Sequence, residues 1–466
     1  MTNKKYLYWT ALFVFLLFFH SNHPLNTDEG VVLSGAWNLI NNKELYIDFF
    51  EFITPCSFYL IFWAWKIFGA HYFIAKLLAI LFIFFSSVGI YKISCQVNSR
   101  EGGIRKCRLH DYLPPLIFIA SSFYWPIISY HTFNIFFIIW AIYFFIKALS
   151  NYSRANFILS GLLTGISILF LQNKGIVVLL ALSSFLFLLW LKERKLLLLK
   201  VSFYYLMSSL LPLTLLLAKW PAKLLYETLI IFPLFNYTET SKTPLNLMAF
   251  FFIVLLLTVW ILRKEGSKKT YFLIFTQFAL LLSAIPLADI YHISLIVFPL
   301  YALALLSFEK LKPLTAKNFY NIINTTIFIT FFTALIIIVI IPSVEFIYRC
   351  PRFYSIANST VISYIKNNCH DTDYIYAGPF LSGLSFEVRQ LNPIPFSFLL
   401  TRLHTEKQFS QAEEALKKYQ PACAVLNYKM VEKYNYNKNN PVDNYIQDNY
   451  KLIFQNGDIL IYKRND

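Results

Sequence analysis

Long apolar runs separated by short polar segments fill the first 341 residues of the chain. Most of these runs have about the 20 residues that an α-helix needs to cross ~30 Å of hydrocarbon, so the pattern predicts a polytopic α-helical membrane protein. About eleven spans are predicted, at residues 6–19, 72–93, 112–129, 132–149, 155–171, 176–191, 196–217, 246–262, 270–288, 291–308 and 319–341. No small-x-small cleavage pattern follows the first run, which predicts a retained membrane anchor.

One further apolar run, residues 53–68, is too ambiguous to assign by length alone. The strongly basic segments are residues 100–108, 147–154, 192–195, 263–269 and 310–317. Because Lys and Arg concentrate in cytoplasmic loops, these segments should all lie on one side, and they do so only if residues 53–68 do not cross. The charge pattern therefore predicts an interfacial or re-entrant helix there, a cytoplasmic N-terminus and an external C-terminus. We expect the protein to lie in the cell (inner or plasma) membrane.

After residue 341 the pattern changes to short alternating helices and strands. Helices are predicted at 355–368 and 405–419, strands at 373–377 and 422–426, and a hairpin at 451–455 and 458–462 around Asn456-Gly457. This alternation predicts a small extracytoplasmic α/β domain at 342–466. Residues 1–341 then form a transmembrane domain whose first outer loop covers 23–70. We expect the C-terminal domain to cover that loop and to carry no catalytic residue.

The composition agrees with a membrane location, at 57% hydrophobic and 19% aromatic residues with a mean hydropathy of +0.54. The formal net charge is +16, but only +2 of it falls in residues 342–466. The remainder lies in short clusters between apolar runs, which is typical of cytoplasmic loops and excludes a nucleic-acid-binding face. The six cysteines have no metal-ligand spacing, and Cys350 with Cys369 is a candidate disulfide if the C-terminal part lies outside the cytoplasm.

Four carboxylates gather in the first outer loop: Asp28, Glu29, Asp48 and Glu51. Acidic groups beside a bilayer are costly unless they are paired or used, so the cluster is a candidate catalytic site. A structural alternative is that Asp28 and Glu29 lie in the first turn of a short surface helix behind Asn26 and Thr27. Asp48 also has a structural alternative to catalysis, which is that its side chain only stabilises the conformation of the loop.

The loop resembles that of the GT-C membrane glycosyltransferases, and within them the branch of the protein O-mannosyltransferases and lipid A aminoarabinose transferases. The matching residues are Asp28, Glu29, Tyr46, Asp48, Glu51, Pro55, Tyr59, Phe68 and Gly69. Weaker matches are Gly161 and Gly165 with Gln172 and Lys174, and His292 with Pro299. The chain departs from the pattern at Val31 and Phe52, where the aminoarabinose transferases have cations, and at His131, where bacterial relatives often have an acid.

The resemblance implies transfer of a sugar, with inversion, from a polyprenyl-phosphate donor to an external protein, lipid or surface-glycan acceptor. An acceptor hydroxyl needs a carboxylate to take its proton, and Asp28 is the first candidate. Glu29 or Glu51 would orient the acceptor or a bound cation. A leaving lipid phosphate needs cationic or polar partners, for which Lys174 with Gln172 is predicted. An ordinary interfacial lysine is the alternative for Lys174.

The remaining predicted substrate contacts are His292 with Asp289, and the aromatic residues Tyr59 and Tyr237. His292 is a candidate for contact with phosphate or a divalent metal, and otherwise a water-facing histidine at a helix end. No other cofactor is predicted. Tyr237 is a candidate for stacking on a sugar, or else belongs to the interfacial aromatic belt.

Two other classes of protein compete with the enzyme. A transporter or flippase of lipid-linked saccharides would also have many spans and a basic cytoplasmic face, but it favours two similar halves and broken helices at mid-membrane. The sequence shows no such symmetry between two halves, and the polar cluster lies in an outer loop. A non-catalytic scaffold would leave the four clustered carboxylates unexplained.

Overall fold

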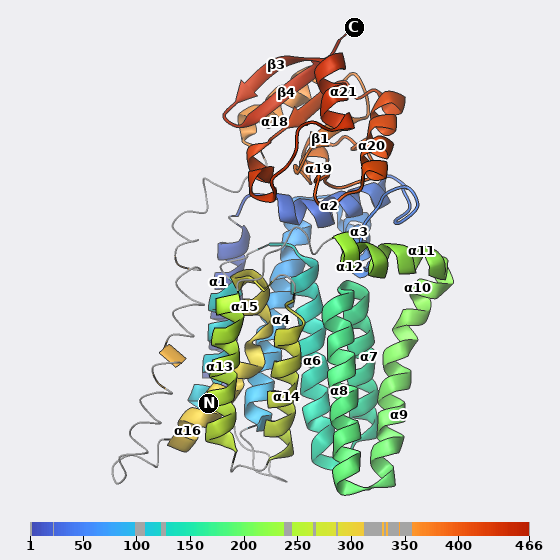
Figure 1. Ribbon diagram of the computed structural model, residues 1–466. Coiled ribbons are helices and arrows are strands. Elements are labelled where there is room, and N and C mark those ends of the chain that lie inside the picture. Colours follow the sequence, from blue (N-terminus) through green and yellow to red (C-terminus); the bar gives the residue numbers. More distant parts are fainter. Residues whose placement is uncertain are drawn as a thin grey trace.

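The computed structural model describes residues 2–21, 23–97, 108–122, 127–236, 245–263, 267–285, 288–311 and 357–465, with the isolated positions 329, 332, 333 and 344. A helical bundle carries the C-terminal domain on one end, and the N-terminus lies at the opposite end (Figure 1). The predicted span at 319–341 and the basic segment 100–108 fall almost wholly outside the described residues.

The bundle follows the predicted apolar runs closely. Its helices are α1 (Thr2–Ser21), α4 (Tyr72–Val97), α5 (Leu113–Ser122), α6 (Tyr130–Asn151), α7 (Arg154–Phe170), α8 (Gln172–Glu193), α9 (Leu196–Leu210), α10 (Thr214–Lys219), α13 (Leu245–Leu262), α14 (Lys268–Leu282), α15 (Ile290–Ile296) and α16 (Phe298–Leu311). Within the described residues, four helical segments are long and apolar enough to cross a membrane, or five if the pair α15 and α16, bent by 58°, is one span. The polytopic helical fold is thus confirmed, while the number of eleven spans stays a prediction.

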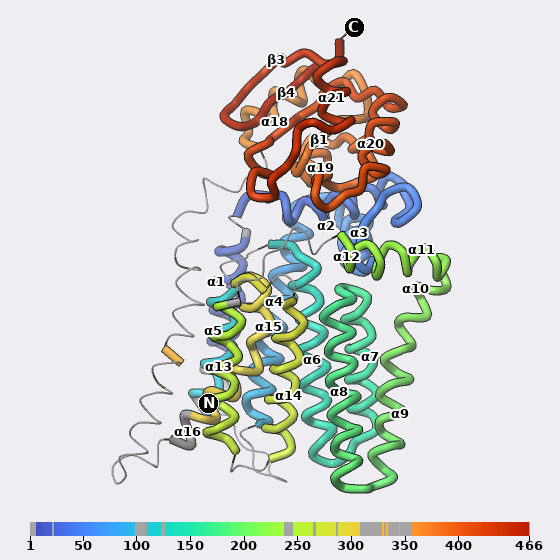
Figure 2. Tube along the Cα trace, viewed as in Figure 1, coloured from blue at the N-terminus to red at the C-terminus, as the bar shows by residue number. Residues whose placement is uncertain are grey.

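A layer of short helices separates the bundle from the C-terminal domain (Figure 2). It contains α2 (Thr27–Ile40), α3 (Cys56–Phe68), α11 (Ala222–Tyr226), a π-helical turn (Glu227–Ile231) and α12 (Phe232–Asn236). Helix α2 begins at Asn26, whose side chain accepts a hydrogen bond from the backbone N–H of Glu29, so the capping alternative considered for this segment is realised. Helix α3 has only 13 residues, about 20 Å at 1.5 Å per residue, which is too short to cross hydrocarbon of ~30 Å.

The C-terminal domain is built on a four-stranded sheet with the order β1-β2-β4-β3. Strands β1 (Ile375–Gly378) and β2 (Cys423–Leu426) are parallel, while β3 (Tyr450–Asn456) and β4 (Ile459–Arg464) form the predicted hairpin around Gly457. The helices are α18 (Ser359–Asn368), α19 (Leu384–Val388), α20 (Glu406–Tyr419) and α21 (Pro441–Asn449), with a 3₁₀ helix at Lys429–Tyr434. The predicted α/β elements are all present, and α19 and α21 were not predicted.

The candidate disulfide between Cys350 and Cys369 is contradicted by the structure. Cys369, at the end of α18, is bonded to Cys423 at the start of β2, with a Cα–Cα distance of 5.6 Å. The two cysteines are 54 residues apart in sequence. Only the packing of α18 against the sheet brings them together, so their spacing carried no signal for this pairing. Cys350 lies outside the described residues.

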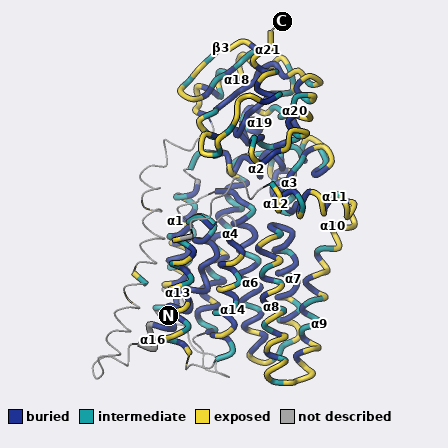
Figure 3. Tube along the Cα trace, in the orientation of Figure 1, coloured by how far each residue is buried: buried dark blue, intermediate teal, exposed yellow. Residues whose placement is uncertain are grey.

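The C-terminal domain packs directly on α2. The backbone N–H of Gly383 donates to the Ser34 hydroxyl at 2.9 Å, and the Trp37 indole N–H donates to the Gln390 carbonyl at 2.9 Å. A Cβ at Gly30 would lie 1.7 Å from the Ser382 carbonyl oxygen, so only glycine allows this close approach. Buried residues of α2 and of the C-terminal domain belong to one apolar cluster (Figure 3), and the domain therefore holds α2 in place.

Candidate active site

Asp28 lies in the first turn of α2, on the layer between the bundle and the C-terminal domain. Its side chain keeps a solvent-accessible face. The surrounding protein raises the pKa of this carboxyl through desolvation, while the electrostatic effects of Lys433 and His292 act in the opposite direction. Asp28 thus combines access to solvent with a raised proton affinity, which suits a group that accepts a proton during turnover.

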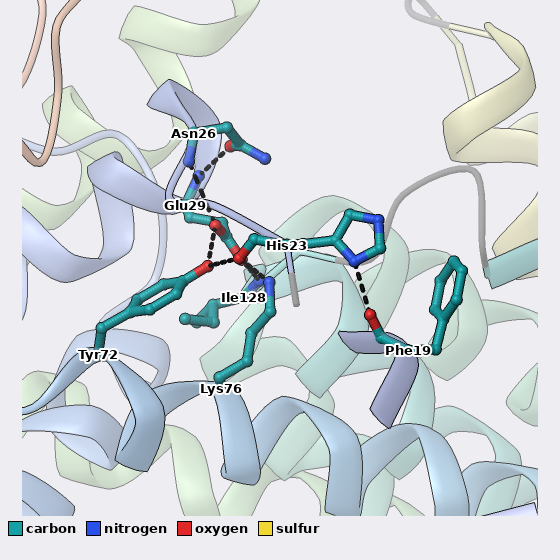
Figure 4. Close-up of polar contacts among 7 residues, drawn as sticks. All are labelled: Phe19, His23, Asn26, Glu29, Tyr72, Lys76 and Ile128. Carbon is teal, nitrogen blue, oxygen red and sulfur yellow. Dashed lines mark hydrogen bonds and ion pairs between the residues drawn. The ribbon is translucent and has the colours of Figure 1, made fainter. Parts of the chain in front are cut away.

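Glu29, the next residue, is fully buried and surrounded by donors (Figure 4). Its carboxylate forms an ion pair with Lys76 of α4 and accepts hydrogen bonds from the Tyr72 hydroxyl at 2.8 Å and the Ile128 backbone N–H at 2.9 Å. It also accepts from the Asn26 backbone N–H, completing the cap of α2. These contacts join α2 to α4 and to the segment before α6, so the geometry favours a role in positioning Asp28.

A chain of polar side chains lies in the bundle near Asp28, close enough for His292 and Asp289 to act electrostatically on its carboxyl. The Lys174 ammonium, on a side chain only 2% exposed, lies 3.2 Å from His131 Nδ1, and an ammonium can only donate in such a contact. The His131 ring lies edge-on to the His292 ring at 4.6 Å. His292 in turn donates from Nδ1 to Asp289 at 2.7 Å. His131 stands where bacterial relatives of the family that the chain resembles often have an acid. In this structure it is a direct partner of Lys174.

The polar chain opens into a cavity of about 670 Å³. Its wall is formed mainly by aliphatic and aromatic side chains of α7, α8, α10 and the layer of short helices. The polar lining includes His131, Lys174, Gln172 and His292; the apolar lining includes Ile168, Leu171, Leu213, Leu216, Leu217, Leu225, Leu229, Ile230 and Ile285. An apolar cavity with charged groups gathered at one part of its wall suits an amphipathic ligand with a long hydrocarbon portion.

Glu51 is buried at 1% exposure, and its Oε1 atom has no hydrogen-bond partner among the described residues. Burial raises the pKa of this carboxyl to about 8, although a hydrogen bond with Ser397 of the C-terminal domain lowers it. Glu51 is therefore mainly protonated near neutral pH in the folded protein, and a protonated carboxyl can donate a hydrogen bond but cannot act as a base.

The raised pKa of Glu51 predicts a pH-dependent stability. The folded protein holds this proton up to a pH of about 8, whereas the unfolded chain releases it near 4.5. Stability should therefore fall between these values as pH rises, by about 1.4 kcal/mol per pH unit for this one group. Thermal unfolding in detergent between pH 5 and pH 8 should show a steeper fall in Tm for the wild type than for Glu51→Gln. Parallel curves would contradict the assignment.

Asp48 and Gln172 make contacts within and around the loop. Asp48 is exposed, and its Oδ2 atom accepts a hydrogen bond from the Glu44 backbone N–H at 2.7 Å. The Gln172 amide donates to the Phe52 carbonyl at 2.7 Å and to the Leu229 carbonyl at 3.2 Å. Both residues thus hold the shape of the layer, and Gln172 also lines the cavity.

The two predicted aromatic contacts have different outcomes. The Tyr59 hydroxyl accepts a hydrogen bond from Lys219, and its ring lies 6.3 Å from that of Trp220 and 6.1 Å from that of Phe62. Tyr237 lies outside the described residues, and its predicted stacking on a sugar stays a prediction. Tyr46, one of the matched loop residues, donates to the Ile53 carbonyl at 2.6 Å and orders the turn between α2 and α3.

The described residues contain no group of three or more His, Cys, Asp or Glu side chains placed to hold a metal ion. Asp289 and His292, predicted as possible metal contacts, bond to each other. Two side chains alone do not make a three-ligand metal site.

The chain has the fold of the GT-C membrane glycosyltransferases. Two crystal structures of ArnT from Cupriavidus metallidurans, one bound to undecaprenyl phosphate and one in the apo state, match it with TM-scores of 0.64 and 0.62 at 12% and 11% sequence identity. Each match covers 99% of this chain and 98% of the other.

The oligosaccharyltransferase from Archaeoglobus fulgidus, solved as a complex with Zn and sulfate, matches with a TM-score of 0.54 at 12% identity. That match covers 97% of this chain and 73% of the oligosaccharyltransferase. Searches of family models and of curated proteins find no match. At these identities the similarity establishes the fold, and the chemistry must be argued from the residues present.

Proposed function

We propose that this protein is an integral membrane glycosyltransferase that moves a sugar, with inversion, from a polyprenyl-phosphate donor to an external acceptor. The proposal rests on one observation, which is that a candidate base and a candidate lipid-phosphate site lie close together. A solvent-accessible carboxylate, Asp28, lies beside a chain of polar groups that ends at Lys174 in the wall of a largely apolar cavity. A donor with a lipid tail and a phosphate-linked sugar matches this arrangement, since the tail suits the apolar cavity and the phosphate suits Lys174.

The proposed reaction is a single displacement at the anomeric carbon. Asp28 takes the proton of the acceptor hydroxyl as its oxygen bonds to that carbon, while the bond from the carbon to the phosphate oxygen breaks. The electron pair of that bond leaves with the polyprenyl phosphate, and the negative charge on the phosphate grows. Attack from the side opposite the leaving group inverts the configuration. A protonated Glu51 would serve as a hydrogen-bond donor to substrate.

Lys174 is proposed to bind the leaving phosphate. It is buried, it lines the cavity, and its contact with His131 holds the ammonium in place, so His131 acts as a positioning residue. Binding a growing negative charge with a preorganised cation, away from bulk water, is a strong form of transition-state stabilisation. Asp289 orients His292 in the same chain of contacts.

The donor site predicts unequal effects of two substitutions at Lys174. Lys174→Ala should weaken binding of undecaprenyl phosphate by roughly 10- to 100-fold, because a hydrogen bond to a charged group contributes about 1.5–3 kcal/mol. Lys174→Arg keeps the charge and should bind much more tightly than Lys174→Ala. Binding is measured with purified protein in detergent or nanodiscs. Small and equal effects of both changes would assign Lys174 to packing beside His131.

The location is part of the same proposal. The Cys369–Cys423 disulfide supports an extracytoplasmic C-terminal domain, because disulfides persist in oxidising compartments. The acceptor would then be a protein, lipid or surface glycan outside the cytoplasm.

Mass spectrometry of glycans and lipids tests the function, in cells with the gene, in cells without it, and in cells with an Asp28→Asn copy. A sugar modification that depends on Asp28 is expected, and identical profiles in all three strains would contradict the proposal.

A further inference from the structure

The C-terminal domain brings one of its own cations toward the active site. Lys433 lies in the 3₁₀ helix Lys429–Tyr434, and Val431 of this helix is buried in an apolar cluster with Val31 of α2 and Phe232 of α12. Val31 follows Asp28 by three positions, so the two side chains are neighbours on one face of α2. The cluster therefore fixes this 3₁₀ helix beside Asp28.

The Lys433 ammonium is held by an aromatic contact. Its Nζ atom lies 4.9 Å from the centre of the Tyr434 ring, and that ring packs against Phe380 of the same cluster at 6.3 Å. A cation over an aromatic face is attracted by the ring, which limits the positions that the lysine adopts. Lys433 itself stays exposed, so its charge can reach a bound ligand.

The electrostatic surroundings of Asp28 include Lys433. Burial raises the pKa of Asp28, and Lys433 is the strongest of the neighbouring charges that lower it. The other charged or titratable groups that act on Asp28 are His292, Glu29 and Asp289. Glu29 is already paired with Lys76, and Asp289 is paired with His292. An anionic substrate entering beside these carboxylates would need positive charge close by.

Resting on the proposed function, we propose that Lys433 is an anion-binding residue of the active site. Its ammonium contacts the phosphate of the polyprenyl-phosphate donor as a second cation besides Lys174. One cation comes from the bundle and the other from the C-terminal domain, so the anion site is complete only when that domain is docked on α2. The domain then takes part in donor binding in addition to covering the loop.

The test is binding of undecaprenyl phosphate by the full-length protein, with undecaprenol as the probe that lacks the phosphate. Lys433→Gln should weaken undecaprenyl phosphate binding by about tenfold, corresponding to ~1.4 kcal/mol, and leave undecaprenol binding unchanged. Lys433→Arg should keep most of the affinity. Because Lys433 is exposed, the difference between wild type and Lys433→Gln should shrink as ionic strength rises.

Lys429→Gln is the matched control, since Lys429 lies in the same 3₁₀ helix and its charge is engaged by Asp458 at 3.1 Å. It should bind undecaprenyl phosphate like the wild type. If Lys433→Gln binds normally while Lys174→Ala does not, the inference fails and the proposed function stands. If Lys433→Gln weakens undecaprenol binding as much as undecaprenyl phosphate binding, Lys433 has a structural role and the inference is also overturned. A wild-type protein that does not bind undecaprenyl phosphate would overturn the proposed donor itself.

Discussion

Replacing Asp28 by asparagine is expected to leave the fold and donor binding intact and to slow sugar transfer by roughly 10²–10⁴-fold, the usual contribution of a general base. The amide keeps the size and the hydrogen-bonding shape of the side chain but cannot take the proton of the acceptor hydroxyl. Little destabilisation is expected, because Asp28 is accessible to solvent and the cap of α2 is made by Asn26 and Glu29. Turnover of a polyprenyl-phosphate sugar is the measurement, with undecaprenyl phosphate binding and Tm as controls for folding.

Asp48→Asn is the matched control for the loss of one carboxylate from the same loop. Its observed contact is with the Glu44 backbone N–H, which an amide oxygen can also accept, so it should keep most of its activity. Should Asp28→Asn turn over at a near wild-type rate while Glu51→Gln is inactive, Asp28 is not the base. Glu51 would then take the proton, which requires its carboxyl to be ionised in the substrate complex. Should all amide variants of the loop remain active, the glycosyltransferase proposal fails.

Much of the fold was predictable because membrane spans leave a strong signal. Runs such as 72–93 and 132–149 differ from α4 and α6 by only a few residues, since a helix in hydrocarbon needs an uninterrupted apolar stretch. Local turn chemistry also located the hairpin at Asn456-Gly457. Helix α21 was missed although Asn440 followed by Pro441 is a recognised helix start.

The roles of the loop carboxylates were less predictable. Asp28 and Glu29 are adjacent, and both were predicted to be catalytic. Successive residues on a helix point about 100° apart, however, so when one faces the active site the next faces elsewhere. Here Glu29 points to Lys76 of α4, which a one-dimensional pattern cannot indicate. The same limit applies to Lys433, about 400 residues from Asp28 and brought near it only by domain packing.

Replacing Glu29 by alanine is expected to destabilise the protein by about 3–5 kcal/mol, because it takes the carboxylate away from a buried ammonium. Lys76 is only 1% exposed, and Glu29 is fully buried between α2, α4 and the segment at Ile128 (Figure 4). Glu29→Gln should also be strongly destabilised, since an amide cannot neutralise Lys76. Thermal or denaturant unfolding in detergent measures the loss.

The double variant Glu29→Gln with Lys76→Met separates structure from catalysis at this position. It removes both buried charges together, and replacing a buried ion pair by uncharged groups of similar volume is often neutral or stabilising. Stability should therefore recover relative to Glu29→Gln alone. Recovery of turnover along with stability would identify Glu29 as the residue that positions Asp28 through the ion pair between α2 and α4. A stable double variant with no turnover would mean instead that the Glu29 carboxylate acts on the substrate directly, because the loss of the fold could no longer explain the loss of activity.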